Sequence, residues 1–541
     1  MPANKNAMTR YKILDDLTRS NSSAYFGLTD MKTTMNKKYI DYLQEISKED
    51  LRKGLLGYGL FADKLPAIFT SKAFYDYCES MDFPTFEKVG RDYIRYESTR
   101  NTNVPRLLSI PSPLSYSNLC NCIVSNWAEI VRILGENTDG QKYKYSQIHL
   151  QKLKSKDHLF EMSLNYEDRD KNLMKSIQKI PIGNKYRVDA DISNCFPSIY
   201  THVISWALVG KEEAKRNKDK PSIWYNVIDF FSRNIKNGET NGLLIGPHVS
   251  NLLSEIVLCC VDKELCDKYQ YVRNIDDFTC YVDSEDKAER FLLDLNDILR
   301  KYELNLNTKK TKITKLPINS DSNWVSSLNS FFIGDTYTDE NKLVFKKQRL
   351  KAYLDLSISL AKETGNSAVY TYAIKTIANT VIGKDAKEYY IDLIHQLLCL
   401  YPYLVHWMEA YIFDVFDITT ERIQTISQDL YDIGIKRHIY EACTFSLYWS
   451  IKYNFSLKSK YVDDSINCSD CIFMLLAFLK AKRDKNIEAQ EIFIDKAKSL
   501  TDELDKYWIF VYEVLSKEEL PEGEYRTLKN RKISFIRSEY L

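Results

Sequence analysis

Two short segments of the chain place carboxylates at the ends of expected strands. In YRVDADISNCFPSI (residues 186–199), strand alternation leads to Asp191, shortly before a proline that marks a helix start. In YVRNIDDFTCYV (residues 271–282), two β-rich runs flank Asp276 and Asp277 without a glycine, which predicts a tight hairpin with both acids at its tip. Two unit charges about 4 Å apart repel by roughly 4 kcal/mol at an effective dielectric of 20. Three such acids in one pocket would therefore need a divalent cation.

The chemistry that such a site supports is the in-line transfer of a nucleotide. Magnesium suits it because Mg²⁺ takes carboxylate and phosphate oxygens and retains water, and Mn²⁺ is the alternative ion. Two ions roughly 3.5–4 Å apart would activate an attacking 3′-hydroxyl and hold a triphosphate with its leaving pyrophosphate. Taken singly, the first motif fits a capped strand-to-helix turn better, and the Asp-Asp pair fits a solvated turn better. The order of the motifs along the chain therefore has to decide.

Further elements surround the acidic motifs in an order that favours the metal interpretation. Between them, NGLLIGPHVSNLLSEI (residues 241–256) predicts a glycine turn followed by an amphipathic helix, and small turn residues let a base pair or sugar approach the backbone. After the hairpin we expect a helix over residues 286–299 and then the basic stretch LNLNTKKTKI (residues 304–313). FFIGD (residues 331–335) predicts a further short hairpin.

Two other segments look like polymerase or metal motifs but lack partners. YVDD (residues 461–464) is followed by no strand, and no acidic motif precedes it at suitable spacing, so we interpret it as a loop or helix cap. Cys468 and Cys471 have zinc-like spacing without a second Cys or His pair, which argues against a zinc site. Most of the twelve cysteines lie in apolar segments, as expected for reduced thiols.

The length and composition of the chain indicate a multidomain globular protein. Its 541 residues are too many for one compact core, and 44% hydrophobic with 28% charged residues argues against a disordered chain. A net charge of +1 does not indicate a nucleic-acid binder by itself, so phosphate binding has to use local basic clusters. No apolar run reaches membrane-spanning length, so we expect a cytoplasmic protein without membrane contact.

The pattern along the chain predicts three regions and an α+β fold. Residues 1–90 are expected to be mainly helical, with one helix around residues 37–51. Residues 91–340 alternate short β-rich runs with helices. Residues 341–541 have few prolines and glycines and show helical spacing of apolar residues, which fits an all-α domain of HEAT-like repeats or a plain helical bundle.

The order of these motifs resembles the right-hand fingers and palm of reverse transcriptases, with motifs A to E in sequence. The resemblance covers residues 91–335, a little under half of the chain. Asp191 with Phe196 resembles motif A, residues 242–255 resemble motif B, and residues 273–278 resemble motif C. An RNA-directed DNA polymerase is the activity that this resemblance implies.

Residue by residue, the resemblance implies a metal and nucleotide site. Asp191, Asp276 and Asp277 would be the catalytic residues and would hold the two metal ions. Phe196 would be the steric gate, whose ring leaves no room for a 2′-hydroxyl, and Ile192 would belong to the dNTP-binding site.

The resemblance extends to motifs that would contact the triphosphate. VPRLLSIP (residues 104–111) resembles the fingers segment whose arginine grips the incoming nucleotide, here Arg106, with Arg100 as companion cation. Residues 307–313 resemble motif D, which would place Lys310 near the pyrophosphate. Residues 331–335 resemble motif E. Each of these cations equally fits an ordinary surface charge.

The motifs depart from the usual reverse-transcriptase pattern at two places. Motif C usually begins with an aromatic residue, but Asn274 and Ile275 precede the acids here. Motif B usually reads Pro-Gln-Gly, and Ile245, Gly246 and Pro247 stand in its place without the template-contacting glutamine. The Ile-Gly-Pro turn and the long helical tail together resemble the Abi-like (abortive-infection, defence-associated or unknown-group) branch of prokaryotic reverse transcriptases.

This second resemblance implies an antiphage enzyme of the bacterial cytoplasm that forms homo-oligomers and carries a HEAT-like C-terminal domain. Its partners would be dNTPs, a noncoding RNA template and the DNA product, and its primer an RNA, a DNA or a protein hydroxyl. Two alternatives stay open. One is template-independent, terminal-transferase-like DNA synthesis, and the other is a catalytically silent palm that serves as an RNA-binding oligomeric scaffold.

Small and basic residues at two places are candidates for contact with nucleic acid. Gly246 and Pro247 would let the nucleic acid approach the backbone of motif B. Lys142, Tyr143 and Lys144 combine charges with a ring that could stack on a base. A solvated charge run explains this second group equally well.

Overall fold

The structure is a computed structural model, and it describes residues 38–102, 104–139, 179–319, 322–331 and 344–541. Residues 39–541 form one compact unit, and every element below belongs to it. In the described residues no helix is both long and apolar enough to cross a lipid bilayer.

Short helices precede the first strand. The single helix expected around residues 37–51 is instead two helices, α2 (Tyr39–Gln44) and α3 (Lys48–Arg52). The break has a local cause, because Ser47 accepts a hydrogen bond from the Asp50 amide and the Asp50 carboxylate accepts one from the Ser47 amide. This capping box starts a new helix. A π-helical turn, η1 (Lys53–Tyr58), and α4 (Lys72–Ser80) follow.

A two-stranded hairpin comes next and carries the arginine-containing segment. β1 (Tyr93–Ser98) pairs antiparallel with β2 (Arg106–Pro111), with Ser98 opposite Arg106. Alternate residues of β1 are buried, so one face of the hairpin packs inward. Because Arg106 is the first residue of β2, it lies next to the loop at the tip of the hairpin. The helices α5 (Pro113–Ser125) and α6 (Trp127–Asp139) follow.

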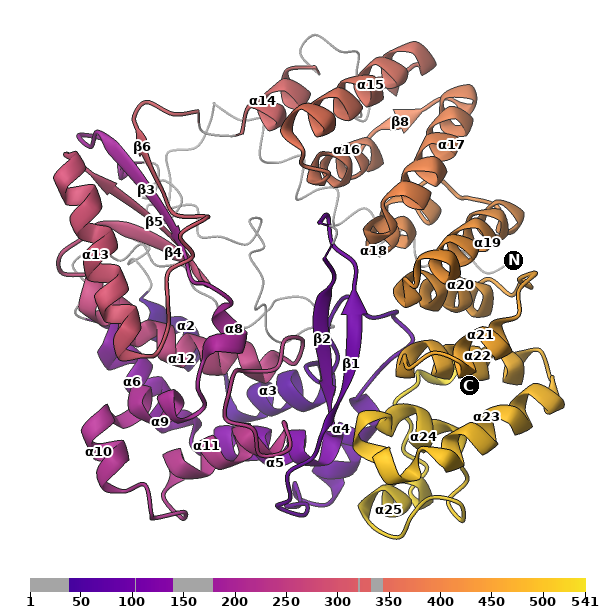
Figure 1. The fold of residues 1–541 in the computed structure, drawn as a ribbon, viewed down its shortest axis with the longest axis horizontal. Coiled ribbons are helices and arrows are strands. Elements are labelled where there is room, and N and C mark those ends of the chain that lie inside the picture. Colours follow the sequence, from indigo (N-terminus) through magenta and orange to yellow (C-terminus); the bar gives the residue numbers. More distant parts are fainter. Residues whose placement is uncertain (1–37, 103, 140–178, 320–321, 332–343) are drawn as a thin grey trace, which may run out of the picture. The chain divides into compact units, whose positions relative to one another are not determined.

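Four antiparallel strands form the sheet that carries the acidic motifs (Figure 1). The register places Asp191 opposite Asp277. The hairpin predicted over residues 271–282 is confirmed, and the helix predicted over residues 286–299 is present as α13, which packs against the sheet. In spatial order the strands are β4 (Tyr271–Asn274), β5 (Asp277–Val282), β3 (Tyr186–Asp191) and β6 (Lys312–Lys315), and α13 spans Glu285–Lys301.

The helix that follows the glycine turn is a central element of this region. α12 (His248–Leu265) begins after Pro247 and is buried along most of its length, because α6, α9 and α13 pack around it. It is therefore a core helix rather than the amphipathic one expected. The neighbouring helices are α8 (Cys195–Ser198), α9 (His202–Val209), α10 (Lys211–Arg216) and α11 (Trp224–Asn234).

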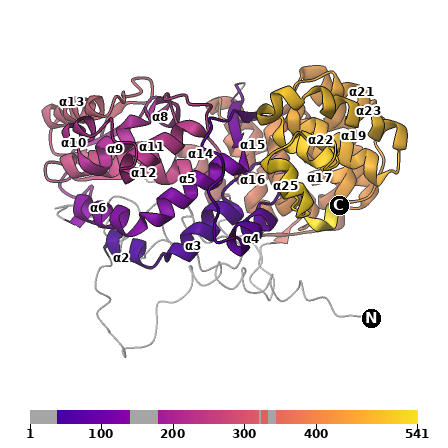
Figure 2. The same cartoon turned by 90° about the horizontal axis from the view of Figure 1, so that it is seen from below.

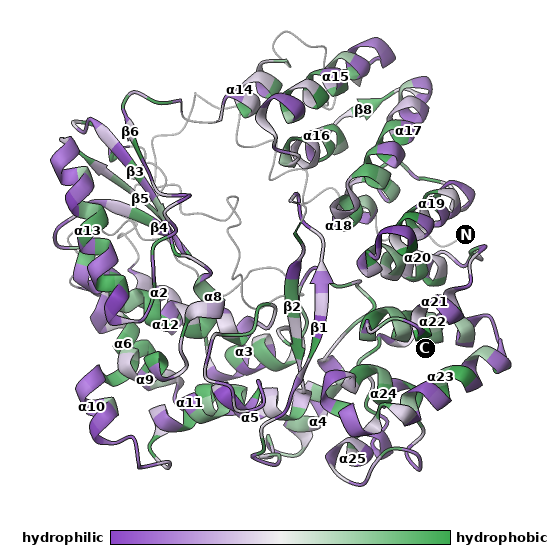
Figure 3. Cartoon of the chain, in the orientation of Figure 1, coloured by the Kyte–Doolittle hydropathy of each residue, from purple (hydrophilic) through white to green (hydrophobic). Residues whose placement is uncertain are grey.

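After β6 the described chain is almost entirely helical, as the sequence predicts. Figure 3 shows the contrast between a core helix such as α22, which is hydrophobic, and a surface helix such as α10, which is hydrophilic. Two short strands, β7 (Val344–Phe345) and β8 (Val381–Ile382), pair in parallel. The helices are α14 (Asn323–Ser330), α15 (Lys347–Thr364), α16 (Ala368–Ala378), α17 (Lys384–Leu400), η2 (Pro402–Leu404), α18 (Val405–Met408), η3 (Glu409–Phe413), α19 (Thr420–Arg437), α20 (Tyr440–Lys452), α21 (Tyr461–Ile466), α22 (Cys471–Arg483), α23 (Ile487–Ser499), η4 (Thr501–Lys506), α24 (Trp508–Val514), α25 (Glu524–Asn530) and η5 (Ser538–Tyr540).

The last helices pack against the base of the β1–β2 hairpin and the segment before it. Figure 2 shows α25 on the same side of the molecule as α4. The indole Nε1 of Trp508 donates a hydrogen bond to the carbonyl of Ile110, at 3.3 Å. Ile536 forms an isolated antiparallel bridge with Phe69. Segments from both ends of this unit therefore form one core beneath the hairpin.

Candidate functional site

The three predicted acids meet at one end of the four-stranded sheet. Asp191 ends β3 directly opposite Asp277, the first residue of β5. Asp276 lies in the two-residue turn before β5, and its carbonyl accepts a hydrogen bond from the Ile192 amide at 3.2 Å. The backbone of motif A is thus tied to the turn of motif C, which brings three carboxylates from distant segments together.

The pKa values of these acids reflect their crowding. Burial, a proton shared with Asp191 and the charge of Asp276 raise the pKa of Asp277 to about 6. Burial also raises the pKa of Asp276, and the charge of Asp191 adds to the shift. Burial of Asp191 would raise its pKa, but hydrogen bonds from Lys310 Nζ (2.7 Å) and Asn307 Nδ2 (2.8 Å) outweigh that effect and lower it.

These carboxylates fit a divalent cation chemically. In the described part of the chain, no three His, Cys, Asp or Glu side chains already surround one point as a preformed metal centre. Yet Asp191 and Asp277 lie close enough to share a proton, and Lys310 already places a positive charge on Asp191. A cation between the two acids would relieve their repulsion, and Asp276 is the third donor within reach of the same charges.

Motif B is docked against the segment that follows Asp191. The Leu243 amide donates a hydrogen bond to the carbonyl of Phe196 at 2.7 Å. Phe196 is half-buried on α8. Gly242 has a φ of +79°, and a Cβ added to it would lie 2.5 Å from the carbonyl oxygen of Pro197. The close approach of the two motifs therefore requires a glycine at position 242.

This close approach gives a stability prediction for Gly242→Ala. The added methyl group collides with the Pro197 backbone and the alanine strains a positive φ, so we expect a loss of about 2 kcal/mol or more. Gly210→Ala is the matched control, because Gly210 also has a positive φ (+86°) but a Cβ added there would have nothing within 4 Å. Thermal midpoints of the two variants measure the difference. Equal losses would contradict the steric explanation.

The β1–β2 hairpin contributes one cation, Arg106, that interacts with the acids. Arg106 interacts electrostatically with Asp276, while burial and the charge of Arg100 lower the pKa of Arg106. Arg100 Nε also donates a hydrogen bond to the carbonyl of Val104 at 3.2 Å. Lys64, which we did not predict, lies close enough to both arginines for their charges to affect it, although burial is the main reason that its pKa is lowered. The three cations together could bind a triphosphate.

Gly246 and Pro247 lie where motif B contacts the fingers hairpin. The Ser109 amide of β2 donates a hydrogen bond to the carbonyl of Ile245 at 2.8 Å, and a Cβ on Gly246 would be 3.1 Å from the Ser109 carbonyl oxygen. Pro247 precedes α12 as its N-cap residue. The lack of a side chain at Gly246 therefore lets strand β2 approach the backbone of motif B. This packing explains the glycine independently of the expected contact with nucleic acid.

Some expected features lie outside the described residues or look different. Lys142, Tyr143 and Lys144 are outside the described residues, as is most of the FFIGD segment, residues 331–335. The YVDD segment forms most of α21, so it is helical, and its Asp464 accepts a hydrogen bond from the hydroxyl of Tyr431 at 2.9 Å.

Sequence reasoning missed two buried groups of charged residues, one behind the acidic turn and one at the β1–β2 hairpin. Arg273, in motif C, is buried together with Glu255 and Asp262 of α12. A signal was available, because Glu255 and Asp262 are seven residues apart and so share one face of a helix that is apolar along much of its length. Glu441 anchors Thr99 of the fingers hairpin from 342 positions away, and no local pattern reveals that pairing.

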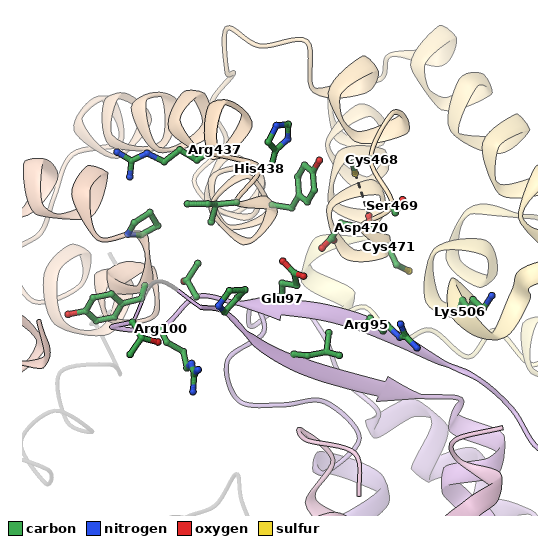
Figure 4. Close-up of a pocket in the computed structure, with 18 of the residues that line it drawn as sticks. Arg95, Glu97, Arg100, Arg437, His438, Cys468, Ser469, Asp470, Cys471 and Lys506 are labelled. Carbon is green, nitrogen blue, oxygen red and sulfur yellow. Dashed lines mark hydrogen bonds between the residues drawn. The ribbon is translucent and has the colours of Figure 1, made fainter. Parts of the chain in front are cut away.

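A cavity of about 1120 Å³ lies between the β1–β2 hairpin and the C-terminal helices, and Arg100 is among the residues that line it (Figure 4). Arg95, Arg437 and Lys506 line it together with Glu97 and Asp470. Burial raises the pKa of Asp470 to about 6, although hydrogen bonds from backbone amides hold it down. The balance of positive and negative side chains matches no single class of ligand.

Comparison with known proteins identifies the region that contains the acids. Residues 123–337 match the family "Reverse transcriptase (RNA-dependent DNA polymerase)", and this range includes β3, α12 and the β4–β5 hairpin. The chain therefore contains a reverse transcriptase domain, which supports RNA-directed DNA polymerase activity. No curated protein matches the chain.

Solved structures of telomerase share a weak similarity with the chain. Apo telomerase from Candida tropicalis matches at 10% identity, over 70% of this chain and 68% of that chain, with a TM-score of 0.27. Telomerase from Candida tropicalis in complex with a TWJ fragment of telomeric RNA matches at 10% identity, over 72% of this chain and 67% of that chain, with a TM-score of 0.26.

Proposed function

We propose that the chain is a metal-dependent DNA polymerase of bacterial antiphage defence that adds dNTPs on a noncoding RNA template. The observation that carries the polymerase part is the pairing of Asp191 with Asp277 beside Asp276, opposite Arg106 of the fingers hairpin. The defence role, the bacterial cytoplasm, a HEAT-like tail and homo-oligomers rest on the Abi-like resemblance of motif B and the helical C-terminal region.

In this proposal the acids hold two divalent cations, which supply charge stabilisation for in-line attack of a hydroxyl on the α-phosphate of a dNTP. Arg106 and Arg100 bind the triphosphate from the fingers side. Lys310, which donates a hydrogen bond to Asp191, would neutralise charge on the leaving pyrophosphate or give it a proton. Ile192 holds the turn that carries Asp276 through its backbone amide.

The proposed steric gate predicts the effect of Phe196→Ala. Removing the ring makes room for a 2′-hydroxyl, so the ratio of kcat/KM for rNTPs to that for dNTPs should rise by roughly 10²-fold. Single-nucleotide incorporation with matched rNTP and dNTP measures the ratio. Phe230→Ala, another half-buried phenylalanine of the same domain, is the control and should leave the ratio unchanged. An unchanged ratio in Phe196→Ala would assign the gate elsewhere.

The function itself is tested with the purified full chain, an RNA template, a DNA primer, labelled dNTPs and Mg²⁺. We expect products whose sequence is complementary to the template, and we expect chelation by EDTA to stop their synthesis. Absence of incorporation with either Mg²⁺ or Mn²⁺ would refute the polymerase and favour the silent scaffold. The natural primer, which could also be a protein hydroxyl, is identified by the molecule that stays covalently attached to the 5′ end of the DNA product.

Template-independent synthesis is the second candidate, and one observation favours it. Motif B has Leu244-Ile245-Gly246-Pro247 where a template-contacting glutamine usually lies. Leaving out all RNA and sequencing the products separates the two candidates. Products of unchanged sequence and yield would select the template-independent activity.

The defence role has its own test. Phage should form fewer plaques on a bacterial strain that expresses the wild-type chain than on a strain that expresses Asp191→Ala at the same level. Equal protection by both chains would show that DNA synthesis is not what protects the cell.

A further inference from the structure

Arg273 is one of the largest fully buried side chains in the described residues, and it lies three positions before Asp276. Its side chain is 1% exposed, and its partners Glu255 and Asp262 are 4% and 1% exposed. Both partners belong to α12, so the arginine joins that core helix to the strand that leads into the acidic turn. A buried charge persists only when its partners satisfy it.

The hydrogen bonds of Arg273 use the whole guanidinium group. Nε and Nη2 donate to the Asp262 carboxylate at 2.9 and 2.6 Å, and Nη1 and Nη2 donate to the Glu255 carboxylate at 3.1 and 3.2 Å. Nη1 also donates to the carbonyl of Ile275 at 2.9 Å. These contacts engage all five N–H donors of an arginine, and a lysine, with three donors on one nitrogen, could not replace them.

The contact with Ile275 matters because the turn is strained. Ile275 has a φ of +53°, a conformation that β-branched residues rarely adopt. Strained residues persist when their surroundings hold them in place. The carbonyl that Arg273 holds belongs to the peptide bond that leads directly to Asp276, so the orientation of this peptide bond sets where the following carboxylates lie.

Further hydrogen bonds hold the two carboxylates that bind Arg273. The Tyr271 hydroxyl donates to Asp262 Oδ1 at 2.7 Å, and the Cys259 thiol donates to Glu255 Oε1 at 3.3 Å. The two carboxylates of α12 therefore hold the guanidinium in place, and Tyr271 of the same strand as Arg273 holds one of these carboxylates. The hydrogen bond to the Ile275 carbonyl links this group to the turn.

We propose that Arg273, held by Glu255 and Asp262, is a positioning residue that fixes the turn of Asp276 and Asp277 in the geometry needed to bind metal. The role rests on the proposed polymerase function but concerns a residue that does not touch substrate. Loss of the Ile275 contact lets the turn relax from its strained conformation, which misplaces two of the three metal-binding carboxylates together.

The test compares full-length Arg273→Lys with the wild type by direct metal binding and by kinetics. We expect Mn²⁺ affinity, measured by electron paramagnetic resonance, to fall by about 10- to 100-fold, in the range seen for residues that orient metal ligands. The kcat for dNTP incorporation should fall by roughly 10²-fold, while KM for dNTP changes by less than about 3-fold. High Mn²⁺ should restore part of the kcat.

A control separates positioning from general loss of stability. Lys480, near the end of α22, is 3% exposed and pairs with Asp484 just after that helix, whose side chain is 35% exposed, so Lys480→Met also removes a buried cation from its ion pair. It should lower the thermal midpoint and leave Mn²⁺ affinity and kcat unchanged. Where Arg273→Lys fails to fold, Glu255→Gln, which keeps the shape of the side chain, takes its place in the same measurements.

The outcomes are distinguishable from those of the polymerase test. Wild-type Mn²⁺ affinity and kcat in a folded Arg273→Lys or Glu255→Gln chain would overturn the proposal. So would losses that match those of Lys480→Met at equal stability. If the wild type incorporates no dNTP, the polymerase is refuted, but the Mn²⁺ measurement still decides whether Arg273 positions the acids.

Discussion

An Asp277→Asn chain should incorporate dNTPs at least about 10³-fold more slowly than the wild type at saturating Mg²⁺. The substitution keeps the size of the side chain but removes one of the charges that hold the cations, and such charge stabilisation is worth several kcal/mol. Each 1.36 kcal/mol of barrier corresponds to a tenfold change in rate. Single-turnover incorporation measures the loss, and Asp276→Ala should cause a similar one.

The same substitution should stabilise the metal-free fold. Burial and the neighbouring acids raise the pKa of Asp277 to about 6, so its ionised form is unfavourable at neutral pH. In the presence of EDTA, Asp277→Asn should therefore unfold at a higher temperature than the wild type. An inactive variant that is also more stable cannot owe its inactivity to misfolding.

Asp189→Asn is the matched control for this prediction. Asp189 lies two residues before Asp191 on the same strand face, but it accepts hydrogen bonds from Thr279 Oγ1 and Arg187 Nε, both at 2.9 Å. Its replacement should leave incorporation within a few-fold of the wild type. Equal losses in both variants, or an active Asp277→Asn chain, would contradict the assignment of the metal-binding acids.

The second large effect is expected at Glu441, which anchors the fingers hairpin. Glu441 of α20 is 1% exposed, and its carboxylate accepts hydrogen bonds from the Thr99 amide at 2.6 Å and from the Thr99 hydroxyl. The Tyr96 hydroxyl donates to it at 3.3 Å, and His406 Nε2 lies 3.3 Å from it. One buried carboxylate of the C-terminal region thus holds Tyr96 of β1 and Thr99, which follows that strand.

Glu441→Ala should destabilise the chain and weaken dNTP binding together. Removing the carboxylate leaves several buried donors without an acceptor, which costs about 3 kcal/mol. The hairpin carries Arg100 and Arg106, so a loosened hairpin should raise KM for dNTP more than it lowers kcat. Thermal unfolding and steady-state incorporation measure the two effects. A large loss of stability with an unchanged KM would show that the anchor does not position the arginines.

The shifted pKa values of Glu441 and His406 make the stability of the fold depend on pH. Burial raises the pKa of Glu441 to about 7, above the ordinary value of 4.5, so its ionisation makes stability fall as pH rises through that window. Burial and the charge of Lys64 lower the pKa of His406 to about 3, below its ordinary 6.5, so its contribution makes stability rise with pH between those values. Between pH 4.5 and 6.5 the two contributions oppose each other.

Glu441→Gln removes the loss of stability that ionisation of Glu441 causes as pH rises, and it leaves the contribution of His406 in place. The thermal midpoint of this variant, relative to the wild type, should therefore increase as pH rises from about 4.5 to 7. Measurements at pH 4.5, 5.5 and 6.5 test the sign of the change. A difference that stays constant over this range would mean that Glu441 does not change its protonation there.

The sequence was sufficient to predict that the three acids lie together. It was not sufficient to predict the distant contacts that hold the surrounding elements in position. Asp191 and the Asp276–Asp277 turn each follow from strand alternation, and the order of the motifs predicted that they meet, as the register of β3 and β5 shows. The helix break at Ser47 could have been recognised from the Ser-x-x-Asp capping pattern. The pairing of Thr99 with Glu441 could not, because hydrogen bonds between segments 342 positions apart depend on packing that no local pattern encodes.

The packing of the C-terminal helices against the base of the β1–β2 hairpin has a consequence for biosynthesis. Arg91, just before β1, forms an ion pair with Glu524 at 3.0 Å, across 433 positions of sequence. A ribosome that has already made the hairpin must therefore add more than four hundred further residues before that hairpin gains its support. Until then the buried face of β1 lacks the C-terminal helices that cover it, and transiently exposed apolar surface of this kind favours aggregation during synthesis.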